Sequence, residues 1–224
     1  MKRIYRPSPN HDDRGGQSVD MLVLHYTGMP SGEAAIDRLC DPASKVSAHY
    51  TVDEDGTVYA HVPEARRAWH AGVSHWAGAA NVNSRSIGIE LVNPGHEFGY
   101  RPFPDAQLAA LTPLCHGILL RYPIASWRVL GHSDVAPARK DDPGELFAWK
   151  RLADAGIGLW PVPGDSNLGA ESLARYGYDA HAPLDKVITA FQRHFRPRAV
   201  NGVWDDECAR LLHGLLEKFT RPAL

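Results

Sequence analysis

The chain has 224 residues, with 24 Lys and Arg against 26 Asp and Glu, and its formal net charge is −2. Apolar residues make up 44% and charged residues 22% of the chain, which excludes a disordered or fibrous protein. The near-neutral balance argues against nucleic acid or an anionic membrane as the main partner. The apolar runs are too short for a helix that spans a bilayer.

The three cysteines favour a reducing compartment. Cys40, Cys115 and Cys208 are far apart and form no C-x-x-C pair, so we expect free thiols. The N-terminal segment has early basic residues but no apolar stretch behind them, so the sequence as written carries no signal peptide. We therefore expect a cytoplasmic protein. A periplasmic protein whose signal segment was removed from this sequence is the alternative.

The first part of the chain alternates between strand-like and helix-like segments. The continuous apolar run at residues 21–26 is typical of a strand buried on both faces. Residues 31–39 predict a helix that starts at a capping serine. The β-rich runs at 48–52 and 57–61 flank an Asp-Gly turn and predict a hairpin.

Three further elements complete this first part. Residues 86–92 predict a strand, and residues 128–132 predict a strand that ends in a histidine. Residues 105–122 predict a helix, which Pro113 should kink or delay. Together the elements predict an α/β fold class with a central mixed β-sheet flanked by helices.

A stretch rich in proline, glycine and polar residues divides the chain. It predicts a linker at 161–167 between a first domain at 1–160 and a small three-helix domain at 168–224. The amphipathic helices expected in the second domain lie at 168–176, 184–195 and 205–219. A bundle of fewer than about 60 residues is only marginally stable by itself.

Two histidines lie at the ends of predicted strands, where ligands collect in an open sheet. They are His25 and His132, and a polar loop with several carboxylates follows the second one. Two imidazoles and one loop carboxylate would make a three-ligand zinc site with water in the fourth position. This pattern alone is weak, because a strand-end histidine is more often a hydrogen-bonded structural residue.

Glu90 and Lys140 are the other two candidates for chemistry. Glu90 lies within an apolar strand, where a carboxylate without a partner is costly, and Gly88 leaves space on the same face. A structural ion pair of Glu90 with an arginine such as Arg85 is the alternative. For Lys140, the alternative is a solvated loop lysine.

These candidates fall within six short motifs. In chain order the motifs are Leu24-His-Tyr-Thr27, Val46-Ser-Ala-His-Tyr50, Asp55-Gly-Thr-Val-Tyr59, Ala68-Trp-His-Ala-Gly72, Ser86-Ile-Gly-Ile-Glu-Leu91 and Gly131-His-Ser-Asp-Val-Ala-Pro-Ala-Arg-Lys-Asp-Asp-Pro-Gly144. Together they resemble the motifs of the zinc-dependent N-acetylmuramoyl-L-alanine amidases of the type 2 amidase family, which is related to the peptidoglycan recognition proteins. The resemblance runs from about residue 20 to 149. It implies hydrolysis of the amide between the lactyl group of N-acetylmuramic acid and L-alanine.

The resemblance also implies which residues hold the zinc ion. His25 and His132 match the two histidine ligands of the family, and Asp142 matches the carboxylate ligand. Asp134 and Asp141 are alternatives in the wrong register, and we interpret them as residues that hold the loop.

Roles in catalysis and substrate binding follow from the same resemblance. Glu90 matches the catalytic glutamate, and Lys140 matches the lysine that stabilises the developing negative charge. Residues expected to contact the substrate are Tyr26, Lys45, Trp69, His70, Asn81 and Arg85. Lys45 and Asn81 stand where cytosolic recycling members carry arginines.

The C-terminal part resembles the three-helix peptidoglycan-binding-like domain that follows this amidase in some bacterial members. We expect a monomeric enzyme that acts on muropeptides or peptidoglycan during cell-wall recycling. One alternative is a periplasmic amidase of wall turnover, because that C-terminal domain occurs in envelope-anchored members. Another is a non-catalytic peptidoglycan recognition module, although such modules typically lose the third zinc ligand, which Asp142 supplies here.

Overall fold

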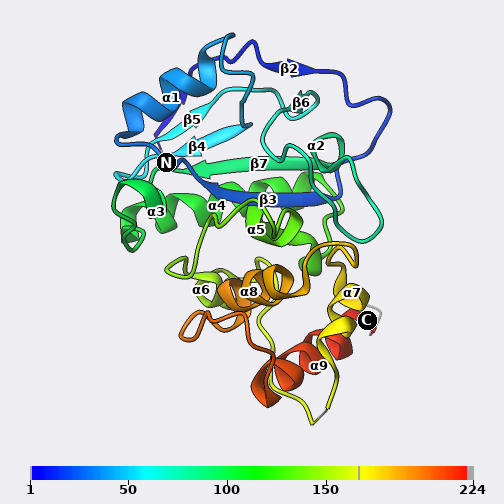
Figure 1. Ribbon diagram of the computed structural model, residues 1–224. Coiled ribbons are helices and arrows are strands. Elements are labelled where there is room, and N and C mark those ends of the chain that lie inside the picture. The colour runs from blue at the N-terminus through cyan, green and yellow to red at the C-terminus, as the bar shows by residue number, and fades with distance from the viewer. Residues whose placement is uncertain (1, 166, 221–224) are drawn as a thin grey trace.

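A computed structural model of the chain describes residues 2–165 and 167–220 (Figure 1). Its main strands are β1 (Arg3–Tyr5), β3 (Met21–Tyr26), β4 (Tyr50–Val52), β5 (Val58–Ala60), β7 (Ser86–Leu91) and β8 (Val129–Gly131). They form one sheet in the order β1-β5-β4-β7-β3-β8, and β4 and β5 are the antiparallel pair among otherwise parallel neighbours. A separate ribbon pairs β2 (His11–Asp12) with β6 (Arg67–Ala68).

Helices lie on both faces of this sheet. Those within the first 160 residues are α1 (Gly32–Cys40), α2 (Val82–Arg85), α3 (Gly95–Phe98), α4 (Asp105–Arg121), α5 (His132–Val135) and α6 (Trp149–Asp154), with a 3-10 turn η1 at Ser126–Arg128. The C-terminal part contains η2 (Ala170–Ser172), α7 (Leu173–Tyr176), α8 (Leu184–Phe195) and α9 (Asp206–Thr220). Figure 1 shows α7, α8 and α9 together below β3, whereas α1 lies above β4.

The predicted fold class, a mixed sheet flanked by helices, is confirmed. One detail of the prediction is wrong. His132 does not end a strand but begins α5, because the N–H of Gly131 donates to the carboxylate of Asp134 and turns the chain into a helix. Of the two effects expected of Pro113, the delay is excluded, because α4 begins at Asp105 and contains the proline on its exposed side, while the kink stays a prediction.

The two faces of β3 belong to two different hydrophobic clusters. Leu22 and Leu24 point to one face and pack with residues of α4 and α6. Met21 and Val23 point to the other face and join a cluster that is formed largely by α7, α8 and α9. The C-terminal helices therefore share a core with the sheet, and the domain boundary at 161–167 stays a prediction.

The strand register places the candidate site. β3 and β7 run parallel, with His25 directly paired with Glu90, so both side chains point to the same face. On the other side of β3, the parallel strand β8 ends immediately before His132. Because the carboxyl ends of parallel strands meet at one edge of a sheet, the three residues gather there.

Candidate active site

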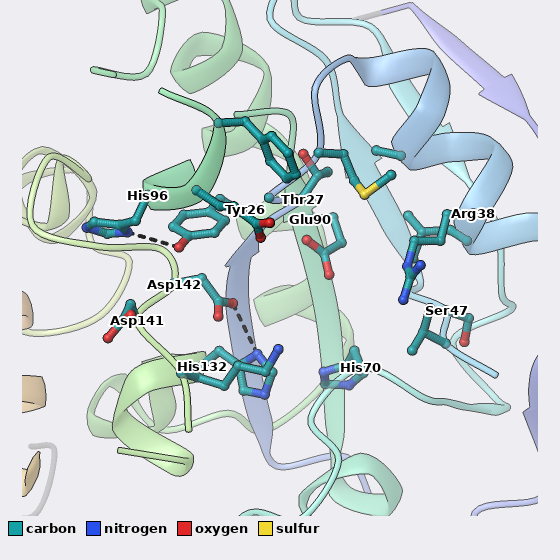
Figure 2. Close-up of a pocket in the computed structure, with 18 of the residues that line it drawn as sticks. Tyr26, Thr27, Arg38, Ser47, His70, Glu90, His96, His132, Asp141 and Asp142 are labelled. Atoms are coloured by element: carbon teal, nitrogen blue, oxygen red, sulfur yellow. Dashed lines mark hydrogen bonds and ion pairs between the residues drawn. The ribbon is translucent and has the colours of Figure 1, made fainter. Parts of the chain in front are cut away.

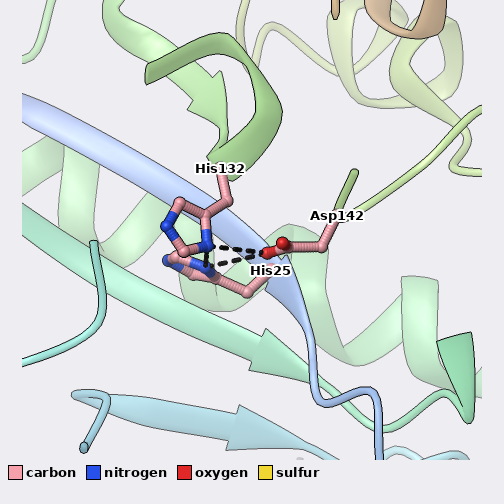
Figure 3. Close-up of side chains that lie close together, drawn as sticks. All are labelled: His25, His132 and Asp142. Atoms are coloured by element: carbon pink, nitrogen blue, oxygen red, sulfur yellow. Dashed lines mark hydrogen bonds and ion pairs between the residues drawn. The ribbon is translucent and has the colours of Figure 1, made fainter. Parts of the chain in front are cut away.

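Three buried side chains converge at this edge of the sheet (Figure 3). Nδ1 of His25 lies 3.0 Å from Nδ1 of His132 and 3.0 Å from Oδ2 of Asp142. Nδ1 of His132 lies 3.1 Å from the same carboxylate oxygen. These three atoms form a group that could hold a metal ion.

The hydrogen bond on the outer nitrogen of His132 fixes its tautomer. Its Nε2 lies 3.0 Å from the carbonyl oxygen of Ala71. A carbonyl can only accept, so Nε2 carries the proton and donates it to Ala71. The lone pair of His132 is therefore on Nδ1, which faces the other two ligand atoms.

A longer chain of hydrogen bonds fixes the tautomer of His25. The hydroxyl of Ser86 donates to the carbonyl of Val82 at 2.7 Å, so it accepts from Nε2 of His70 at 3.1 Å. Nδ1 of His70 must then accept from Nε2 of His25 at 3.0 Å. The space left by Gly88 holds the His70 ring, since a Cβ at Gly88 would lie 2.4 Å from it.

The resulting donor set fits a divalent cation such as zinc. In these tautomers two imidazole lone pairs and a carboxylate face one another with no proton between them. Zinc ligands at about 2.0–2.1 Å in a tetrahedron lie roughly 3.3 Å from each other, close to the spacing observed here. Burial, and then the neighbouring His132, lower the pKa of His25 to about 4, so His25 stays neutral at pH 7. Burial would raise the pKa of Asp142, but the two imidazoles outweigh it and hold that pKa below its ordinary value.

Glu90 stands beside this group without a structural ion pair. Its Oε2 atom is buried and has no hydrogen-bond partner within residues 2–165 and 167–220. Burial, and then the charge of Asp142, raise the pKa of Glu90 well above its ordinary value, while Lys140 opposes the shift. The alternative of a pair with Arg85 is wrong, because that guanidinium is bound to Asp20.

A groove of about 540 Å³ opens over the group (Figure 2). Predicted site residues that line it are Tyr26, Trp69, His70, Glu90, His132, Lys140 and Asp142. In Figure 2, Glu90 lies between Asp142 and Arg38 and points into the groove. Lys140 is half-buried at the groove, which argues against a lysine that is simply solvated.

Three residues predicted to contact the substrate are not among those that line this groove. Lys45 is exposed and precedes the two residues of its segment that line the groove. Asn81 and Arg85 line a second hollow. They precede β7, and five residues of strand put Arg85 about 16 Å from Glu90 along the sheet. Contacts of these three residues with the substrate stay a prediction.

Several groove residues were not predicted from the sequence. Arg38 reaches the groove from α1, and Arg139 lines it next to Lys140. The guanidinium of Arg139 donates to the carbonyl of Ala71 at 2.9 Å, which joins the loop that carries Lys140 to the segment that follows Trp69. Arg139 could have been predicted from its position in the polar loop after His132, whereas no local pattern distinguishes Arg38.

Comparison with known proteins identifies the family. A family model described as N-acetylmuramoyl-L-alanine amidase matches residues 15–145. The chain belongs to this amidase family. It is 40% identical over 233 residues to the N-acetylmuramoyl-L-alanine amidase AmiD of Escherichia coli, covering 90% of this chain and 83% of AmiD. The predicted family and the predicted enzyme class are confirmed.

Two further similarities bear on the architecture. The 1,6-anhydro-N-acetylmuramyl-L-alanine amidase AmpD of Enterobacter cloacae is 38% identical over 164 residues, which is 65% of this chain and 86% of AmpD. The structure of E. coli AmiD with the substrate anhydro-N-acetylmuramic acid-L-Ala-D-gamma-Glu-L-Lys has a TM-score of 0.80 and 39% identity. That similarity covers 96% of this chain and 93% of AmiD, and therefore includes the C-terminal helices. Among the described residues, no helix has the length and apolarity needed to cross a bilayer.

Proposed function

We propose that the chain hydrolyses the amide bond between the lactyl group of N-acetylmuramic acid and L-alanine in muropeptides. The family match and the substrate named for the AmiD complex support this reaction. The observation that carries it is the ligand group of His25, His132 and Asp142, which lies next to Glu90 at the base of an open groove.

His25, His132 and Asp142 would hold one zinc ion. Both imidazoles offer a neutral Nδ1, and the carboxylate adds one negative charge, which matches the borderline-soft character of zinc. Bound there, zinc would lower the pKa of a water molecule to roughly 7 and polarise the scissile carbonyl.

Glu90 and Lys140 would perform the proton transfer and the charge stabilisation. Glu90 accepts the proton of the attacking water and passes it to the leaving amine of L-alanine. A raised pKa suits a carboxylate that must take up and release a proton near neutral pH. Lys140 donates to the carbonyl oxygen as negative charge develops there, and such a donor typically contributes about 100–1000-fold in rate. Tyr26 and Trp69 provide walls against which the substrate lies.

Digestion of purified muropeptides, followed by mass spectrometry, tests this function. We expect the zinc-loaded protein to release the free peptide from its muramyl group with the addition of one water. Glu90→Gln should lose roughly 100–10,000-fold in rate while it keeps its zinc. Glu33→Gln, an exposed change on α1, is the control and should match the parent protein. Zinc-loaded Glu90→Gln with parental activity would remove Glu90 from the mechanism.

We further propose a monomeric cytoplasmic enzyme that acts in cell-wall recycling. Cys40, Cys115 and Cys208 are all free thiols, which supports a reducing compartment. Fractionation of cells that express the native gene tests the location, and light scattering tests the oligomeric state. Recovery of the protein with the periplasm or the membrane would favour wall turnover instead.

A further inference from the structure

The loop at residues 132–145 supplies most of the chemistry of the site. His132 and Asp142 belong to the ligand group, and Lys140 lies between them in the sequence. The two ends of the loop are tied together, since the N–H of Ser133 donates to the carbonyl of Asp142 at 2.9 Å. Whatever holds this loop therefore sets the positions of both ligands.

The C-terminal part of the chain holds the beginning of the loop. Asp134 follows His132 by two residues, so its side chain points to the opposite side of α5, away from the groove. Its buried carboxylate accepts hydrogen bonds of 2.7 Å from the N–H of Gly131, the hydroxyl of Tyr178 and Nδ1 of His194. Two of these three donors come from the C-terminal helical part.

Both of these C-terminal donors are fixed by aromatic packing. The His194 ring stacks on Trp149 with the ring centroids 3.7 Å apart, and on Phe195 at 3.9 Å. The ring of Tyr178 lies edge-on to Trp76, with the centroids 4.9 Å apart. Neither donor can move without a change in the shared hydrophobic core, so they present a rigid surface to Asp134.

The neighbouring residue on α8 holds the end of the loop. Nη2 of Arg193 lies 2.7 Å from the carboxylate of Asp141, which stands between Lys140 and Asp142. Nε of the same guanidinium lies 3.8 Å from the carboxylate of Glu145. Consecutive helix residues point about 100° apart, so Arg193 and His194 reach the two ends of the loop from one turn of α8.

We propose that Tyr178, Arg193 and His194 are positioning residues for the metal ligands His132 and Asp142. The C-terminal helices would then be part of the catalytic apparatus, acting through the loop, whether or not they also bind the cell wall. The inference rests on the proposed zinc site. Groups that bond directly to a metal ligand typically contribute about 10–100-fold in metal affinity, and these residues act one bond further out, so we expect the lower end of that range.

The first pair of variants tests the beginning of the loop. Tyr178→Phe removes only the hydroxyl that donates to Asp134. Tyr176→Phe removes a hydroxyl from a tyrosine that is equally buried but not bonded to Asp134, and it serves as the matched control. Zinc affinity is measured on the full chain by competition with a chelator, and the visible spectrum of the cobalt(II) protein reports ligand geometry. We expect Tyr178→Phe to bind zinc about 10-fold more weakly with an altered cobalt spectrum, and Tyr176→Phe to match the parent.

The second pair tests the end of the loop. Arg193→Gln removes the ion pair with Asp141, and Lys186→Gln removes one exposed charge from the same helix as a control. We expect the first to weaken zinc binding about 10-fold and the second to leave it unchanged. Thermal unfolding of each variant separates a lower melting temperature from a change at the metal site.

The outcomes separate this inference from the proposed function. A parent protein that binds no zinc would contradict the metal site and the function that depends on it. A parent that binds zinc tightly, together with Tyr178→Phe and Arg193→Gln variants of unchanged affinity and cobalt spectrum, would overturn the positioning role alone. A lower melting temperature without those changes would likewise reduce the C-terminal helices to a purely structural role.

Discussion

In each histidine of the ligand group, a hydrogen bond on the outer nitrogen, Nε2, leaves the lone pair on Nδ1, which faces the other ligand atoms. His132 uses the carbonyl of Ala71 directly, whereas His25 depends on His70 and on the hydroxyl of Ser86. Burial lowers the pKa of His70 well below its ordinary value, so this link is neutral and has one defined tautomer. The serine at the start of β7 thereby determines which nitrogen of His25 carries a lone pair.

The first prediction concerns this serine. Ser86→Ala leaves Nε2 of His70 without its acceptor, so the tautomer of His70 is no longer fixed and His25 loses part of its orientation. We expect zinc affinity to fall roughly 10-fold in chelator competition. Ser84→Ala removes another buried serine hydroxyl near the same strand, one that does not bond His70, and should leave zinc affinity unchanged. Equal affinities in the two variants would show that the relay does not contribute.

The individual site residues differ in how well they could be predicted from the sequence. Local apolar patterns pointed to His25 near the end of β3 and to His132 directly after β8, whereas Asp142 followed only from the family resemblance. The relay through His70 could not be predicted, because it joins residues from three separate segments. The sequence also could not show that Asn81 and Arg85 line a second hollow, because spacing along the chain gives no position across the sheet.

Among the elements, those with a long or distinct apolar pattern were predicted well. β3, α4 and α8 agree with their predicted ranges to within one residue at each end. β2 and β6 have two residues each and carry no period, and α5 is a single helical turn whose Asp134 bonds to Tyr178 and His194 from the C-terminal part. Short elements of this kind are set by their neighbours in space, which a local sequence pattern does not record.

The proline within α4 leads to a prediction at the scale of one element. Pro113 lies in the helix interior with its side chain exposed. Because proline has no backbone N–H, it cannot donate to the carbonyl of Ala109. Pro113→Ala restores this donor without changing a buried contact. We expect the free energy of unfolding to rise by about 1–3 kcal/mol, and the melting temperature to rise by a few degrees. Calorimetry measures the effect, and an unchanged or lower melting temperature would contradict it.

At the scale of the whole molecule, buried histidines determine the response to acid. Burial is the leading cause that lowers the pKa of His25 to about 4 and of His49 to about 3, and it also lowers the pKa of His61 and His70. Below pH 6.5 the unfolded chain binds protons at these sites and the folded chain does not. The stabilisation that these histidines contribute is therefore fully present above about pH 6.5 and is lost as the pH falls towards 4.

The direction of this pH dependence of stability can be tested by urea unfolding of the metal-free protein at pH 7 and pH 5. We expect a lower midpoint at pH 5. Glu90 acts in the opposite direction, because its raised pKa favours the folded state at low pH and the benefit is lost as the pH rises. One such group cannot offset four histidines, and the fall should persist in Glu90→Gln. A midpoint that is equal or higher at pH 5 would contradict the prediction.

The shared core leads to the last prediction, on the independence of the C-terminal helices. Met21, Val23 and Trp76 of the first part are fully buried against a cluster that α7, α8 and α9 largely form. The N–H of Ala77 also donates to the carbonyl of Gly177 at 2.8 Å, which joins the two parts through their backbones. Removing residues 161–224 exposes this face of the sheet to water.

We expect the truncated chain 1–160 to aggregate or to melt far below the parent protein. Each large apolar side chain that becomes exposed costs about 1.5–3 kcal/mol, and several together approach the 5–15 kcal/mol that is typical for the stability of a whole domain. Gel filtration and circular dichroism measure the outcome, and co-expression of residues 161–224 as a separate chain should restore folding. A monomeric 1–160 fragment with the parental melting temperature would instead establish two independent domains.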